Sequence, residues 1–79
     1  MKQVVIYLMQ QCPFCLKTKE LLQKNEVPFK EIDVKKDEFS WKEMVKKSGQ
    51  MGVPVILINE EIIVGYDEPK LRGMLKLSK

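Results

Sequence analysis

At 79 residues, the chain has room for one small hydrophobic core, so we expect a single soluble domain over residues 1–79. The longest uncharged apolar runs, residues 4–9 and 53–58, are too short for a membrane-spanning helix or a secretion signal. The 14 basic and 11 acidic side chains are interspersed and give a net charge of +3, which predicts a solvated surface and neither a nucleic-acid nor a membrane partner.

The first half of the chain alternates between strand-like and helix-like patterns. Val4–Leu8 is an apolar run rich in β-branched residues, which predicts a buried strand. Pro13–Lys24 has the spacing of a helix that ends at Asn25. The inward stripe of this helix is expected to consist of Cys15, Thr18, Leu21 and Leu22. Apolar and charged side chains alternate over residues 29–34, which favours a second strand.

The second half contains two further helices and a hairpin. Asp37 is suited to cap a helix that ends before Gly49, and Asp67 is suited to cap the last helix. Val55–Ile58 and Glu61–Val64 are apolar runs two residues apart, which predicts an antiparallel hairpin. The inward stripes of the two helices are expected to be Trp41, Met44, Val45 and Ser48, and then Leu71, Met74 and Leu75. The predicted order is βαβαββα.

The chemistry of the chain centres on Cys12 and Cys15, which stand where the first helix follows the first strand. Residues three apart on a helix share one face, so the two sulfurs can form a reversible disulfide. The dipole and free N–H groups at the helix start favour a thiolate on Cys12, which we predict to be the nucleophile. Cys15 lies one turn deeper and is the predicted resolving thiol. Pro13 is tolerated in the first turn, and Phe14 is expected to be exposed between the cysteines.

The rest of the composition narrows the chemistry further. The absence of histidine excludes a Cys–His nucleophilic pair and metal sites that need imidazole. Two cysteines do not make a disulfide scaffold of the secreted type, so we expect a reducing compartment, the cytoplasm.

Two alternatives to redox catalysis by the two cysteines stay open. Two thiolates are half of a four-cysteine metal or iron–sulfur site, which a dimer could complete. The other alternative is a binding protein that uses a groove formed by Phe14, Met51 and Tyr66 to hold a partner without turnover.

Several motifs occur in the same order as in a known family and cover nearly the whole chain. They are Cys12-Pro13-Phe14-Cys15, Glu31-Ile32-Asp33-Val34, Gly52-Val53-Pro54 and Gly65-Tyr66-Asp67. This chain therefore resembles the glutaredoxins. The resemblance implies an α/β protein with the minimal thioredoxin fold, in which helices flank a four-stranded mixed sheet. It also implies a thiol–disulfide oxidoreductase that acts in cell redox homeostasis.

The resemblance assigns roles to two segments away from the cysteines. Val53–Pro54 corresponds to a Val-Pro pair with a cis bond, in which the backbone of Val53 pairs with an extended thiol substrate. Gly65, Tyr66 and Asp67 correspond to the segment that holds the γ-glutamyl carboxylate of glutathione at the start of the last helix, where N–H groups suit an anion. Asp67 is also expected to serve simply as the helix cap.

Two positions depart from the glutaredoxin pattern, and they affect which molecule is expected to reduce the oxidised form of this protein. A lysine three residues before the first cysteine is common in the family, and here that position is Met9. Met51 stands where a basic residue is common, and both methionines are expected at the rim of the groove. The groove therefore resembles that of glutaredoxin-like redoxins, some of which are reduced by thioredoxin reductase. We expect a monomer without a bound cofactor, which reduces disulfide-containing proteins and draws electrons from glutathione or thioredoxin reductase.

Overall fold

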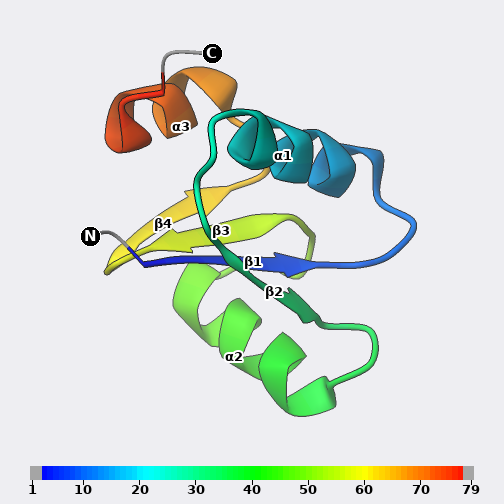
Figure 1. The fold of residues 1–79 in the computed structure, drawn as a ribbon. Coiled ribbons are helices and arrows are strands. Elements are labelled where there is room, and N and C mark those ends of the chain that lie inside the picture. Colours follow the sequence, from blue (N-terminus) through cyan, green and yellow to red (C-terminus); the bar gives the residue numbers. More distant parts are fainter. Residues whose placement is uncertain (1–2, 78–79) are drawn as a thin grey trace.

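The computed structural model describes residues 3–77, in which three helices and four strands follow one another in the predicted order (Figure 1). No helix in this part of the chain is long and apolar enough to cross a membrane. The elements are β1 (Val4–Leu8), α1 (Pro13–Lys24), β2 (Lys30–Asp33), α2 (Glu38–Ser48), β3 (Val55–Ile58), β4 (Glu61–Val64) and α3 (Glu68–Leu75).

The four strands form one mixed sheet in the order β2-β1-β3-β4. β1 lies parallel to β2 and antiparallel to β3, and β3 and β4 form the predicted antiparallel hairpin. The two central strands are therefore β1 and β3. Helices α1 and α3 cover one face of the sheet, and α2 covers the other (Figure 1).

The residues that the sequence analysis expects at the ends of α2 and in the β3–β4 turn are found there. The Asp37 carboxylate accepts hydrogen bonds from the backbone N–H groups of Phe39 and Ser40, at 3.1 and 3.3 Å, and so caps α2. Gly49 ends α2 with a φ of 72°, a left-handed conformation that glycine adopts without strain. Asn59, in the β3–β4 turn, has a φ of 54°, as expected for a two-residue hairpin loop.

Successive side chains of β1 point to opposite faces of the sheet and so enter two separate cores. Ile6 packs under α1 and α3 with Leu22 and Leu71, and all three are fully buried. Tyr7 points to the other face, where it packs with Met44 of α2. The larger core, between the sheet and the pair α1 and α3, is the one that contains Cys15.

One boundary differs from the prediction. The strand expected at residues 29–34 extends only over Lys30–Asp33, although the Val34 N–H still donates to the carbonyl oxygen of Leu8 at 3.0 Å. The inward stripe of α2 is confirmed for its apolar members, because Met44 is fully buried and Trp41 and Val45 pack against the same core while partly exposed. Phe39, in the first turn of α2, is 75% exposed.

Replacing Leu22 with alanine should lower the free energy of unfolding by about 2–5 kcal/mol, because the cavity left in the fully buried site cannot be filled. Leu16→Ala on the same helix is the matched control, since Leu16 is 51% exposed and its truncation should change stability by less than about 0.5 kcal/mol. Urea denaturation followed by circular dichroism measures both. Equal losses in the two variants would contradict the burial of this helix face.

Candidate active site

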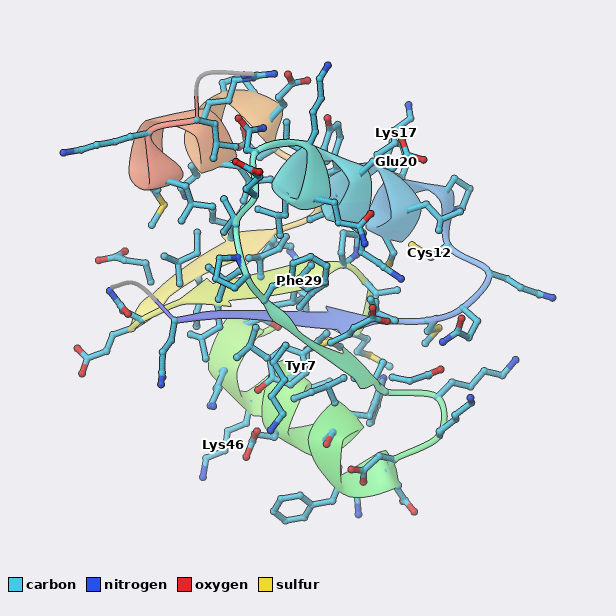
Figure 2. All side chains as sticks on the ribbon, viewed as in Figure 1. Tyr7, Cys12, Lys17, Glu20, Phe29 and Lys46 are labelled. Atoms are coloured by element: carbon cyan, nitrogen blue, oxygen red, sulfur yellow. The ribbon has the colours of Figure 1, made fainter. Side chains whose placement is uncertain are left out.

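Cys12 occupies the N-cap position of α1, with Pro13 directly after it (Figure 2). Its Sγ accepts a hydrogen bond from the backbone N–H of Cys15 at 3.2 Å, and its carbonyl oxygen accepts one from Leu16 N–H at 3.1 Å. The sulfur thus takes the place that a serine or aspartate oxygen takes in an ordinary helix cap. The Cys15 N–H group and the start of α1 therefore both lie against this sulfur.

Cys15 points into the core under α1 and is 2% exposed, whereas Cys12 packs against the edge of the same core. Both cysteines are free thiols, and Cys12 is partly exposed. Burial raises the pKa of the Cys15 thiol to about 12, and its hydrogen bond with the Cys12 thiol acts in the same direction. The pair is therefore unequal, with an accessible sulfur at the helix end and a protonated sulfur one turn below it.

We call residues 9–15, which include the first turn of α1, the redox loop. The segment before β3 lies at the same edge of the sheet as this loop, because Val55 pairs with Tyr7 near the end of β1. The Val53–Pro54 peptide bond is cis, as the resemblance implies. Pro54 is fully buried, whereas Val53 is partly buried and packs against the core cluster that also supports Cys12 and Tyr66. Residues from three separate parts of the sequence thus meet over one core, with Cys12 among them.

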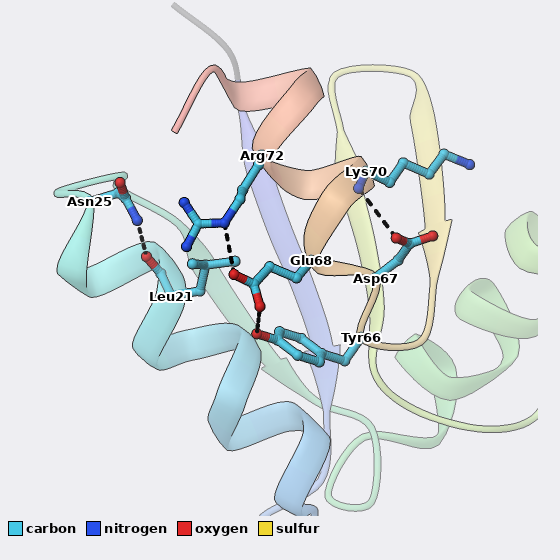
Figure 3. Close-up of polar contacts among 7 residues, drawn as sticks. All are labelled: Leu21, Asn25, Tyr66, Asp67, Glu68, Lys70 and Arg72. Carbon is cyan, nitrogen blue, oxygen red and sulfur yellow. Dashed lines mark hydrogen bonds and ion pairs between the residues drawn. The ribbon is translucent and has the colours of Figure 1, made fainter. Parts of the chain in front are cut away.

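The segment between β4 and α3 is held from both sides. Gly65 has a φ of 78° and donates its N–H to the carbonyl oxygen of Pro54 at 2.8 Å. A carboxylate of Asp67 accepts the backbone N–H of Lys70 at 3.2 Å and caps α3 (Figure 3). The N–H of Gly65 is therefore already engaged, and Asp67 serves as the helix cap that the sequence predicts.

The structure joins two predicted site residues that are far apart in the sequence. The rings of Phe14 and Tyr66 are stacked, with centroids 6.5 Å apart and planes at 20°. Phe14 is 53% exposed, so the pair presents an aromatic surface beside Cys12. The Lys17 ammonium lies 5.5 Å from the centroid of the Phe14 ring, within the range of a cation–π contact.

The two methionines expected at the groove rim lie in different settings. Met51 is 68% exposed in the loop between α2 and β3, and its contact with a substrate stays a prediction. Met9 is partly buried and borders a pocket of about 350 Å³. The other residues that line this pocket are Gln10, Gln11, Asp33, Lys35 and Lys36.

The sequence analysis did not indicate two residues, Glu68 and Arg72, that support Tyr66 from helix α3. The Tyr66 hydroxyl donates a hydrogen bond to a carboxylate oxygen of Glu68 at 3.1 Å, and the other oxygen accepts one from Arg72 Nε at 2.7 Å (Figure 3). The hydrogen bonds from Arg72 and Tyr66 lower the pKa of Glu68 below its ordinary value. The spacing of Glu68 and Arg72 is typical of an ion pair on a helix, but nothing local indicates the contact with Tyr66.

With this geometry established, the comparison with known proteins decides the family. Residues 4–63 match the family model described as glutaredoxin. The chain belongs to the glutaredoxin family. A glutaredoxin-like 8.6 kDa protein from the rubredoxin operon of Clostridium pasteurianum is 37% identical over 73 residues, which cover 92% of this chain and 97% of that protein. Glutaredoxin 3 of Escherichia coli is 37% identical over 68 residues, covering 86% of this chain and 82% of the relative.

Solved structures agree with this assignment. The crystal structure of a glutaredoxin from Archaeoglobus fulgidus matches with a TM-score of 0.87 and 28% identity, covering 96% of this chain and 88% of that one. A mutant of the thioredoxin-like protein BC3987 matches with a TM-score of 0.91 and 31% identity, covering 99% and 100% of the two chains. The predicted α/β fold of the thioredoxin type is confirmed, and family and fold together support a thiol-redox function for this glutaredoxin.

Metal ligation was the alternative use of the two cysteines. Within residues 3–77, no group of three or more cysteine or acidic side chains is placed to hold a metal ion. Cys12 and Cys15 are the two thiolates that this glutaredoxin would offer to a cluster shared between chains.

The unequal exposure of the two thiols predicts selective alkylation. Iodoacetamide at about pH 8 should modify the reduced native protein once, at Cys12, because Cys15 is buried and its pKa is raised to about 12. Peptide mapping by mass spectrometry locates the label. In guanidinium chloride both cysteines should react, which serves as the control. Labelling of Cys15 before Cys12 in the native protein would contradict the geometry.

Proposed function

We propose that this protein is a dithiol–disulfide oxidoreductase that reduces protein disulfides and mixed disulfides with glutathione. The observation that supports this most strongly is the unequal thiol pair, in which Cys12 caps α1 at the surface while Cys15 is 2% exposed beneath it. Membership of the glutaredoxin family supports the same chemistry. The proposed role in the cell is that of an electron donor in redox homeostasis, in the cytoplasm.

The proposed reaction proceeds in two exchanges. The Cys12 thiolate attacks one sulfur of the substrate disulfide, and the other sulfur leaves as a thiolate that takes up a proton. Cys15 then gives up its proton and attacks Cys12 Sγ, which releases the second substrate thiol and leaves a Cys12–Cys15 disulfide. Two electrons and two protons have then passed to the substrate. The raised pKa of Cys15 keeps this thiol protonated during the first exchange.

The proposed binding groove runs beside the accessible sulfur. An extended substrate chain would pair with the backbone of Val53, and an apolar part of it would contact the exposed Phe14 ring. The remaining residues proposed to line the groove are Pro13, Met51, Pro54, Gly65, Tyr66 and Asp67. The contact between the redox loop and the β4–α3 segment, through the stacked rings of Phe14 and Tyr66, supports this extent of the groove.

The proposed reductant of the oxidised protein is glutathione as a co-substrate, with no cofactor bound to the protein itself. Thioredoxin reductase is the alternative. Met9 in place of a lysine supports this alternative, and so does the engaged N–H of Gly65, because each leaves one group fewer to hold a carboxylate of glutathione. Neither route requires a second protein chain in the site, and a monomer is the proposed state.

Serine substitutions test the assignment of the two thiols. Cys12→Ser should abolish disulfide reduction, because the attacking sulfur is lost. Cys15→Ser should keep the reduction of glutathione mixed disulfides, in which external glutathione releases the product, but should lose the reduction of protein disulfides by both thiols. Rates with a glutathionylated peptide and with insulin measure the two activities. Full activity of the Cys12 variant with both substrates would refute the mechanism.

Consumption of NADPH identifies the reductant. The oxidised protein is supplied either with glutathione and glutathione reductase or with thioredoxin reductase alone. Turnover with the glutathione couple is the expected result for a working glutaredoxin. Turnover only with thioredoxin reductase would assign the alternative route, in agreement with the fewer groups available for an anion. A mixture without the oxidised protein is the control for background consumption of NADPH.

A further inference from the structure

The aromatic surface beside Cys12 is fixed by residues that have no part in the thiol chemistry. Phe14 lies two residues after Cys12, and its exposed ring would be free to rotate if nothing held it. Tyr66 packs against it from the β4–α3 segment, with the two planes only 20° from parallel. The orientation of the exposed ring therefore depends on the position of Tyr66.

The position of Tyr66 is fixed through its neighbouring backbone and through its side-chain hydroxyl. On one side, its neighbour Gly65 is joined to Pro54 by a backbone hydrogen bond of 2.8 Å. On the other side, its hydroxyl donates to Glu68, and the second oxygen of Glu68 accepts from Arg72 (Figure 3). The carboxylate is thus occupied on both oxygens, and α3 fixes the far edge of the aromatic pair.

We propose that Glu68 and Arg72 are positioning residues that hold Tyr66 against Phe14, so that the two rings form a recognition surface for an apolar side chain next to a protein disulfide. This inference rests on the proposed oxidoreductase function and adds the class of substrate. A protein segment that pairs with Val53 presents its side chains to both sides of its backbone, and one of them would lie over the rings. A fixed aromatic surface favours such a contact because little side-chain entropy is lost on binding.

Helix α2 supplies a matched control for the ion pair. Glu38 is its first residue, follows an aspartate cap and pairs with Lys42 four residues later at 3.5 Å. Glu68 is likewise the first residue of α3, follows the cap Asp67 and pairs with Arg72. Figure 1 shows that α2 lies on the face of the sheet opposite α1 and α3. Removal of Glu38 therefore changes the same kind of pair without touching the rings.

The test uses the fully reduced protein in single turnovers, which require no reductase. The substrates are two symmetric peptide disulfides that differ only in the residue after cysteine, phenylalanine in one and serine in the other. Hydroxyethyl disulfide, which carries no side chain, is the third substrate. The wild-type protein should favour the phenylalanine peptide by about fivefold to tenfold, the size expected for one aromatic contact. When the peptide concentration is varied, the two peptides should differ in the concentration that gives half the maximum rate and should share the same maximum rate.

Glu68→Ala should reduce this preference to less than about twofold, because Tyr66 and then Phe14 lose their fixed positions. Its maximum rate and its rate with hydroxyethyl disulfide should stay at the wild-type values. Glu68→Gln keeps an oxygen acceptor for the Tyr66 hydroxyl and should retain most of the preference. Tyr66→Phe removes the hydroxyl that Glu68 accepts and should also reduce the preference to less than about twofold, which keeps the test decisive if Glu68→Ala fails to fold. Glu38→Ala should match the wild type throughout.

The outcomes separate this inference from the function on which it rests. Equal rates of the wild type with the two peptides would overturn the inference and leave the oxidoreductase intact. A preference that survives in both Glu68→Ala and Tyr66→Phe would also overturn it, since the rings would then be held without the Glu68 contact. Failure of the reduced wild type to react with any of the three disulfides would instead overturn the proposed function.

Discussion

The inward stripe of α1 is buried against β1, β3 and α3, and this burial decides what each cysteine can do. Leu22 and Thr18 fix the rotation of the helix, since both are fully buried. With the helix rotated in this way, Cys15 must point into the core, and Cys12, at the cap, must lie at its edge. One sulfur becomes accessible and hydrogen-bonded, and the other is desolvated. A different rotation of α1 would remove this difference between two chemically identical side chains.

The second constraint is the meeting of three loops at one end of the sheet. The redox loop, the segment with the cis Val53–Pro54 bond and the β4–α3 segment are separated in sequence but share one supporting core. Gly65 joins the second to the third by a backbone hydrogen bond, and the rings of Phe14 and Tyr66 join the third to the first. The surface around Cys12 is therefore a product of several elements and not of α1 alone.

Helices α2 and α3 begin with the same local pattern, an aspartate cap followed by a glutamate that pairs with a basic residue four positions later. The surroundings of each helix in the fold decide what this ion pair contacts. In α2 the pair Glu38–Lys42 is exposed on both sides, and such pairs contribute little to stability. In α3 the pair Glu68–Arg72 has a third member, the Tyr66 hydroxyl, and the Tyr66 ring in turn stacks on Phe14. Burial of Tyr66 and its hydrogen bond to Glu68 raise the pKa of this phenol, which keeps it a donor.

The sequence by itself determined the elements and the chemistry. Caps such as Asp37 and Asp67, the glycine after α2 and the two-residue turn at Asn59 act through local backbone geometry, so they can be recognised without a structure. The spacing of Cys12 and Cys15 acts in the same local way. The extent of β2 was decided by where this strand pairs with β1 in the fold.

The tertiary structure alone decided the surroundings of the thiols. No local pattern encodes three of the contacts around the thiols: the stacking of Phe14 on Tyr66, the hydrogen bond from the Tyr66 hydroxyl to Glu68, and the hydrogen bond from the Gly65 N–H to Pro54. Contacts of this kind depend on where the packed core places each loop. The two thiols of the proposed reaction lie within four consecutive residues, whereas the shape of the surface beside them follows from the packing of the whole domain.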